Sequence, residues 1–125
     1  MVIELLDKEY SIYRLNPKDI IDNRLIGENF ISITKTDDEI SIVTVSGTLK
    51  HFEKEESCWN ILKINGILDF SMVGIISKIS TLLAIQGISI FVISTYNTDY
   101  IMVKTDKVES TINILEQNGY VINGN

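Results

Sequence analysis

The stretch from Trp59 to Asp99 constrains the fold of this chain more than any other. Residues 59–64 alternate loosely between apolar and polar side chains and end at Asn65-Gly66, which is typical of a strand followed by a turn. Residues 88–95 form an almost unbroken apolar run, and the polar turn after it leads into a further strand at 100–104. The stretch therefore predicts strand, helix, strand and hairpin, in that order.

A helix is expected between the first two of these strands. It should start near Ser71 and end at Gly87, which would take the left-handed conformation just past a helix end. Its apolar stripe consists of Met72, Ile76, Ile79 and Leu83. Two polar points on this unit could hold a ligand, namely the helix start at residues 69–75 and the strand end at residues 94–99.

The C-terminal residues complete a known arrangement. A second helix is predicted over residues 107–118, with Val108, Ile112 and Leu115 as its buried stripe and Gly119 as its end. A short last strand follows at residues 120–122. The order β-α-β-β-α-β predicts an α+β, ferredoxin-like fold, with an antiparallel sheet and both helices on one face.

The first half repeats part of the same plan. Residues 1–6 are expected to form a tail or a short strand, and strands are predicted at residues 11–15, 30–36 and 40–45. Pro17 could open a short helix through Ile21. The polar, acidic residues 46–57 are the expected boundary, and their Glu53–Glu56 run is interpreted as a solvated face. We therefore expect two parts, 1–57 as a reduced half and 58–125 as the complete domain.

The apolar run Ile88–Ile93 carries one further expectation. A strand with one exposed face should alternate, whereas this one is interrupted only by Ser89, which is typical of burial on both faces. The first half, another subunit, or both should then cover the second face or extend the sheet, and a homodimer is expected.

Charge and composition exclude several classes of function. The net charge is −6, with −5 in residues 1–57 and −1 in residues 58–125. The sequence contains no basic patch, so nucleic acid binding is not expected. No segment approaches the ~20 apolar residues that span a membrane, and the start resembles no signal peptide, so a cytoplasmic protein is expected. With one cysteine and one histidine, neither a disulfide, a metal site nor a cofactor is expected.

Several motifs together resemble a known family. They are Trp59, the run Gly66-Ile67-Leu68-Asp69-Phe70, Val73-Gly74-Ile75, Gly87-Ile88-Ser89-Ile90, and the stretch Ile93–Ile101. The hairpin Thr36–Val43 is similar to the first half of the same small two-domain proteins. Over roughly residues 10–122 the chain resembles the ACT-domain family, in the branch of tandem-ACT amino-acid sensors.

This resemblance implies a regulatory protein that binds a free amino acid where two ACT-like domains meet. Backbone N–H groups at a helix start have no intrahelical partner and favour an anion such as the ligand carboxylate, and carboxylates suit its ammonium. The candidate ligand-binding residues of the C-terminal domain are Asp69, Val73, Gly74, Ile75, Thr95, Asn97 and Asp99. Those of the first half are Ser41, Ile42 and Val43.

Other interpretations of the same residues stay open. Asp69 or Ser71 could simply cap the helix, Gly74 could serve helix–sheet packing, and Asp99 could shape a turn. A protein-interaction module without a small-molecule ligand is the alternative function. An enzyme is disfavoured, because a nucleophile next to a base is not evident.

Overall fold

The computed structural model describes residues 1–27, 29–65 and 74–124. The chain forms two compact units, which we call the N-terminal unit (Lys8–Trp59) and the C-terminal unit (Met1–Asp7 with Asn60–Asn125). The expected division lay between residues 57 and 58. The units instead change between Trp59 and Asn60, and the first seven residues belong with the C-terminal unit.

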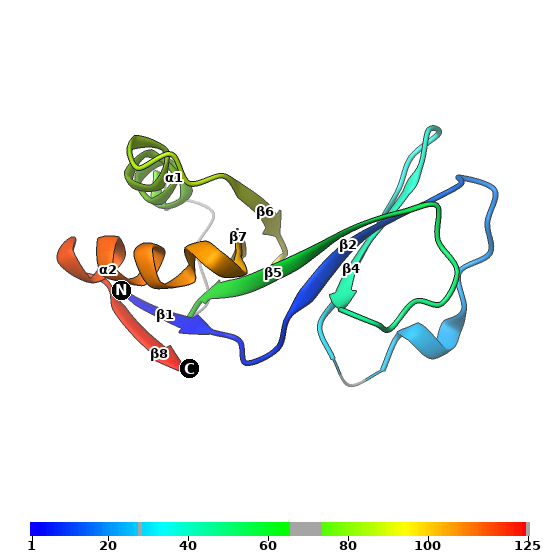
Figure 1. The fold of residues 1–125 in the computed structure, drawn as a ribbon, viewed down its shortest axis with the longest axis horizontal. Coiled ribbons are helices and arrows are strands. Elements are labelled where there is room, and N and C mark those ends of the chain that lie inside the picture. The colour runs from blue at the N-terminus through cyan, green and yellow to red at the C-terminus, as the bar shows by residue number, and fades with distance from the viewer. Residues whose placement is uncertain (28, 66–73, 125) are drawn as a thin grey trace. The chain divides into compact units, whose positions relative to one another are not determined.

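The C-terminal unit has the predicted ferredoxin-like fold (Figure 1). Its strands are β1 (Val2–Leu5), the second half of β5 (Lys54–Ile64), β6 (Ile90–Ser94), β7 (Asp99–Lys104) and β8 (Val121–Gly124). Its helices are α1 (Ile75–Ile85), the 3-10 turn η2 (Thr105–Lys107) and α2 (Val108–Gln117). Hydrogen bonds join the strands in the order β8-β1-β5-β7-β6. Apart from β1, this is the order of the split βαβ arrangement, so the fold prediction is confirmed.

Strand β1 is inserted between β5 and β8. It runs antiparallel to β5, where Ile3 lies opposite Ile64, and parallel to β8, where Val2 lies opposite Val121. An antiparallel sheet was expected, but the pairing of β1 with β8 is parallel, so that part of the prediction is wrong. Gly124, at a φ of +89°, permits the close pairing, since a Cβ there would lie 2.4 Å from the carbonyl oxygen of Leu5.

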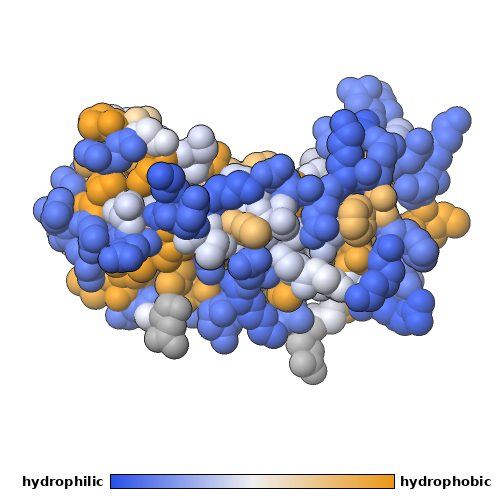
Figure 2. Space-filling model, in the orientation of Figure 1, coloured by the Kyte–Doolittle hydropathy of each residue, from blue (hydrophilic) through white to orange (hydrophobic). Residues whose placement is uncertain are grey.

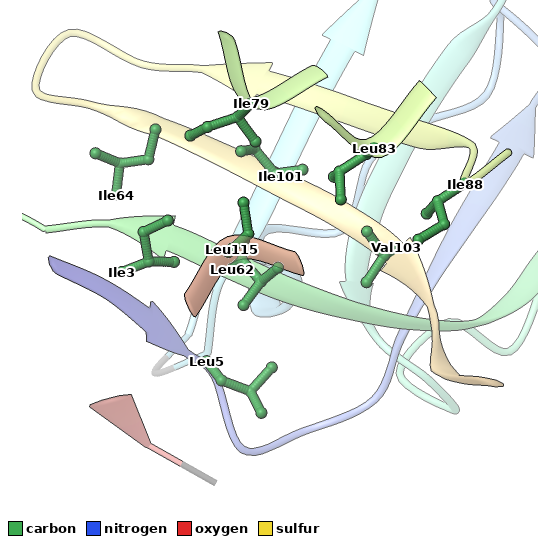
Figure 3. Packing of buried hydrophobic residues seen from close by; sticks show 10 residues of the cluster. All are labelled: Ile3, Leu5, Leu62, Ile64, Ile79, Leu83, Ile88, Ile101, Val103 and Leu115. Carbon is green, nitrogen blue, oxygen red and sulfur yellow. The ribbon is translucent and has the colours of Figure 1, made fainter. Parts of the chain in front are cut away.

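Both helices cover the same face of this sheet. Ile79 and Leu83 of α1 and Leu115 of α2 are fully buried and pack in one cluster with the sheet (Figure 3). The sheet side of the cluster comes from alternating residues of neighbouring strands, Ile3, Leu5, Leu62, Ile64, Ile101 and Val103. Each fully buried Leu or Ile contributes about 1.5–3 kcal/mol. The predicted stripes of both helices are thus confirmed at Ile79, Leu83 and Leu115.

The end of α1 is as predicted. Gly87 has a φ of +72°, its N–H donates to the Ala84 carbonyl (2.9 Å), and the N–H of Ile88 donates to that of Leu83 (3.0 Å). This is the hydrogen-bond pattern with which many helices stop at glycine. The expected start near Ser71 lies outside the described residues.

Strand β6 is not buried on both faces, contrary to the expectation. It pairs with β7 at an edge of the described sheet, none of its residues is fully buried, and the Phe91 side chain is 36% exposed. Ile85 of α1 is also 72% exposed. Figure 2 shows hydrophobic side chains among the hydrophilic surface over the helices of the C-terminal unit. The apolar run therefore supplies an edge strand rather than a central one.

The N-terminal unit repeats the strand order without an α-helix in its described residues. Strands β2 (Tyr10–Leu15), β3 (Ile31–Lys35) and β4 (Ile40–Val45) and the first half of β5 pair antiparallel in the order β3-β4-β2-β5. In each unit the third strand of the motif lies between the first and the second: β4 between β2 and β3, and β7 between β5 and β6. The predicted repeat is therefore visible in topology.

The connection after β2 differs from the prediction. Residues 17–21 form no helix: the N–H of Asp19 donates to the Asn16 carbonyl (2.9 Å), and the N–H of Lys18 to the Asn16 side chain (3.0 Å). The only helical turn described between β2 and β3 is the 3-10 turn η1 (Asn23–Leu25). The side chain of Asn16 competes for the backbone donors at the point where a helix would have to start.

The acidic stretch also differs, because β5 begins inside it at Lys54. Residues 54–58 are exposed, which agrees with the interpretation of a solvated face, and they are extended rather than part of a connecting loop. Opposite Ser11, β5 carries a bulge, since Tyr10 pairs with Trp59 but Ile12 pairs with Glu56. Cys58 takes a φ of +68° in this bulge.

Candidate functional site

Among the described residues, no side chain caps the start of helix α1. Its N-cap is Gly74, with φ +82° and ψ 2°, which offers no side-chain hydrogen bond to the first turn. The first turn also contains no acidic residue. The first N–H groups of a helix have no intrahelical partner, and together with the positive end of the helix dipole they favour an anion at this point.

The reason for glycine at position 74 is its conformation. A Cβ built there would meet no atom within 4 Å among the described residues, so glycine is not required for close packing of helix on sheet. A left-handed φ disfavours any other residue except asparagine or aspartate.

A cavity of about 340 Å³ lies at this helix start. Gly74, Ile75 and Lys78 of α1 line it together with Asn118 and Gly119 from the C-terminal end of α2. The positive end of one helix dipole and the negative end of another thus border the same space, and the Lys78 ammonium adds to the positive side. This arrangement suits a small zwitterion, with its carboxylate at α1 and its ammonium toward α2.

The carbonyl groups at the end of α2 are partly occupied. The Asn118 side chain donates to the Ile114 carbonyl (2.8 Å), and the N–H of Tyr120 donates to the Leu115 carbonyl (3.1 Å). These bonds hold the helix end in place and position the residues that line the cavity.

The turn between β6 and β7 is a second, rigid polar feature. The Thr95 hydroxyl donates to the Thr98 carbonyl (2.9 Å), and the buried Thr98 hydroxyl donates to the Ile64 carbonyl (2.7 Å). The turn is thereby fixed to the end of β5, from which the chain continues toward α1. Thr95 and Asn97 are exposed and Asp99 is half-buried, so none of the three is closed off in the core.

The predicted site residues of the C-terminal domain do not all lie in one place. Gly74 and Ile75 share the cavity at α1, and residues 95–99 form the anchored turn. Asp69 and Val73 lie outside the described residues. Their assignment to a ligand remains a prediction.

The residues predicted from the first half lie on β4 of the N-terminal unit. Ile42 and Val43 are 0% and 2% exposed, and β4 pairs with β2 on one side and with β3 on the other. Their side chains pack in the unit and their backbone serves the sheet, whereas Ser41 is partly exposed. A contact from these residues to a ligand remains a prediction.

Lys78 and Asn118 were missed by the sequence analysis. Lys78 stands one turn into α1, and Asn118 had been assigned only as the end of the second helix. The sequence does contain a glycine next to each of these helix ends, at positions 74 and 119. That the two ends line one cavity depends on the tertiary fold.

A family model described as ACT domain matches residues 54–117, half of the chain. This protein belongs to the ACT-domain family. A second model, described as an N-terminal domain, matches residues 8–49 of this ACT-domain protein. The two matched segments fall largely in the two units of the fold.

Curated relatives of this ACT-domain protein include a sensor. The human protein named cytosolic arginine sensor for mTORC1 subunit 1 is 31% identical over 96 residues, which cover 70% of this chain. They cover 29% of the human protein, so the chain spans less than a third of its length.

Solved structures agree on the fold. A protein from Agobacterium tumefaciens is 31% identical, with a TM-score of 0.89 over 98% of this chain and 91% of its own. The regulatory subunit of aspartate kinase from Thermus thermophilus, in a ligand-free form, has a TM-score of 0.65 at 10% identity, over 94% of this chain and 97% of its own. The second similarity extends to the fold alone.

Two kinds of feature are absent from the described ranges. Within residues 1–27, 29–65 and 74–124, no helix combines the length and the apolar character that crossing a bilayer requires. The same residues contain no group of three His, Cys, Asp or Glu side chains placed to hold a metal ion.

Proposed function

We propose that this ACT-domain protein is a non-catalytic, cytoplasmic regulator that senses a free amino acid. The membership in a regulatory family supports the general role, and the name of the human relative supports an amino acid as the class of ligand. The observation that carries the proposal is the cavity that the start of α1, which no described side chain caps, borders together with the end of α2.

The ligand would lie with its carboxylate at the first turn of α1. The N–H groups there lack intrahelical partners, and Lys78 adds a positive charge. The ligand ammonium would be stabilised by the C-terminal end of α2 and by Asp99 or Asp69, as the resemblance implies. Thr95 and Asn97 would contribute hydrogen bonds to a polar side chain of the ligand.

The site would be completed by a second ACT-like domain. The resemblance implies a ligand at an interface between such domains, with Ser41, Ile42 and Val43 as the candidates from the first half. A homodimer is the simplest source of a second domain, and the exposed apolar edge strand β6 supports it.

A protein-interaction module is the second candidate function. The 36% exposed Phe91 on β6 and the 72% exposed Ile85 on α1 favour it, because apolar side chains of this kind often mark interaction surfaces. A screen of the twenty amino acids by thermal unfolding separates the two. A ligand at about 100 times its Kd adds about 2.7 kcal/mol to the free energy of unfolding, whereas a pure interaction module is stabilised by none of them.

Calorimetry on variants tests the site. Asp99→Asn retains size and removes the charge, and Lys78→Gln removes the ammonium beside the helix start. Asp99→Asn should weaken binding of the amino acid found in the screen about tenfold or more, because one charge of the ligand is then left unpaired. Lys78→Gln should weaken it about three- to fivefold, because the Lys78 side chain is exposed. Gly74→Val is a poorer test than either, since φ +82° strains any side chain there.

Lys107→Gln is the matched control, because Lys107 is also a lysine of the C-terminal unit but does not line this cavity. If both Asp99→Asn and Lys78→Gln bind the amino acid as tightly as the control does, the ligand lies elsewhere.

A further inference from the structure

The N-terminal unit contains a cavity of about 550 Å³ that the proposed sensing role does not use. We call it the loop cavity. Its apolar wall consists of Leu15 and Leu49, each 6% exposed, and the partly buried Ile21 and Leu25, which pack against the same cluster. Cavities that hold small molecules have about this volume and are mostly apolar, with a few polar groups that orient the ligand.

The polar part of the loop cavity is positively charged. Arg24 is neutralised by Asp22, since its Nε and Nη2 atoms donate to the carboxylate at distances of 2.7–3.1 Å. This pair holds the pKa of Asp22 at about 2, so the carboxylate is charged at neutral pH. Lys50 donates to the Gly47 carbonyl (2.8 Å), a neutral acceptor that fixes the ammonium without cancelling its charge.

Lys50 therefore gives the lining of the loop cavity a net positive charge, although the whole chain has a net charge of −6. The Lys50 ammonium, next to His51 at the rim, provides the place for an anionic group. The charge of the cavity thus complements a carboxylate rather than an ammonium.

A second hollow of about 490 Å³ shares Leu15, Ile20 and His51 with the loop cavity. At this side the side chains of Ile20 and Phe52 are 94% and 40% exposed. Asp19 and Glu53 also line it and would repel a second anionic group, although Glu53 is paired with Arg14. The combined space therefore has a cationic end at Lys50 and an opposite end where the apolar side chains of Ile20 and Phe52 lie beside the carboxylates of Asp19 and Glu53.

We propose that the loop cavity is a second ligand site, which binds a small amphipathic monocarboxylate. Its carboxylate lies at Lys50 and His51, and its hydrocarbon chain lies on Leu15, Leu25 and Leu49 and extends toward Phe52. Because every residue involved belongs to the N-terminal unit, the site is independent of the amino-acid site at α1.

Octanoate and octylammonium test the proposal, because they share a hydrocarbon chain and differ in the sign of the charge. Calorimetry on the full chain should give binding of octanoate about tenfold or more tighter than that of octylammonium, since one pair is attractive and the other repulsive. Amide NMR shifts should change in residues 15–25 and 48–53 and not at Lys78.

Lys50→Gln should weaken octanoate binding about three- to fivefold, the upper part of the range expected for an exposed charge pair. Lys18→Gln is the matched control: it removes a lysine of the N-terminal unit, in the connection between β2 and β3, that does not line the cavity, and it should bind as the parent does. Leu25→Asn should weaken both octyl compounds.

Three results would overturn the proposal. One is the absence of octanoate binding at about 10 mM, a concentration that populates even a weak site with a Kd of about 1 mM. The second is equal affinity for the two octyl compounds. The third is a set of shifted amides that lies outside residues 15–25 and 48–53.

Discussion

The hydroxyl of Thr98 donates to the carbonyl oxygen of Ile64 across 2.7 Å, in a buried position. The bond joins residues far apart in the chain, one in the β6–β7 turn and the other at the end of β5. It fixes the polar turn that carries Thr95, Asn97 and Asp99 to the strand end from which the chain proceeds to α1. The turn is therefore a rigid platform rather than a mobile loop tip.

Thr98→Val is expected to lower the free energy of unfolding by about 1–3 kcal/mol, because it leaves the Ile64 carbonyl without its buried donor while preserving shape. Urea unfolding followed by circular dichroism measures the change. Thr111→Val is the matched control, since Thr111 is fully buried and its hydroxyl has no partner among the described residues. It should leave stability unchanged or raise it, and a loss equal to that of Thr98→Val would contradict the explanation.

Cys58 lies in the bulge of β5 and has a left-handed backbone conformation. Its φ of +68° is a conformation that glycine adopts at no steric cost and that other residues adopt at a cost of about 1–2 kcal/mol. Cys58→Gly should therefore be more stable to urea than Cys58→Ala, although glycine in a strand normally destabilises. Cys58→Val should be the least stable of the three. Equal stabilities of the glycine and alanine variants would mean that the bulge is not strained.

Periodicity predicted most of the C-terminal unit, because its helices each bury one stripe. Ile79, Leu83 and Leu115 lie in the core as the spacing indicates. The insertion of β1 could not be predicted: four residues give too short a pattern, and the partners of a strand depend on segments distant in sequence. The first half of β5 was missed because residues 54–58 are exposed and polar, so they lack the apolar alternation of a half-buried strand.

The candidate site was predictable only in part. The turn at Thr95–Asp99 is a local feature that the sequence pattern revealed, and Gly74 was named as a candidate residue, although the helix was expected to start near Ser71 rather than at Ile75. Lys78 and Asn118 become neighbours of one cavity through the packing of α1 beside α2, which no local pattern encodes.

The ion pair of Asp22 and Arg24 gives a prediction about pH. Arg24 holds the pKa of the Asp22 carboxyl at about 2, below the usual 3.8, chiefly through side-chain hydrogen bonds. A depressed pKa of this kind adds stability above about pH 3.8, which is lost as the pH falls through about 2. In Arg24→Gln, NMR titration of the carboxyl carbon should show the Asp22 pKa moving up toward 3.8. Added salt should raise it in the parent protein too, because the pair is exposed, while Lys18→Gln should leave it unchanged.

The edge strand β6 predicts self-association. Phe91 lies opposite Met102 on β7, whereas Ile101 and Val103 belong to the cluster under the helices, so Phe91 projects from the helix-free face. An apolar edge strand of this kind is usually covered in native proteins. We expect a homodimer at micromolar concentration, and light scattering should give twice the chain mass of 14.2 kDa.

A charge on this strand should separate the subunits. Phe91→Lys would place an ammonium in the contact and leave it without a partner, which costs several kcal/mol in a desolvated interface. Val121→Lys is the matched control, because Val121 is a 53% exposed apolar residue on β8, at the other edge of the same sheet. Light scattering should show a monomer for Phe91→Lys and a dimer for Val121→Lys. The opposite pattern would mean that the subunits meet at β8. If the parent protein is a monomer across a wide concentration range, the homodimer prediction is wrong, and a second subunit does not complete the amino-acid site.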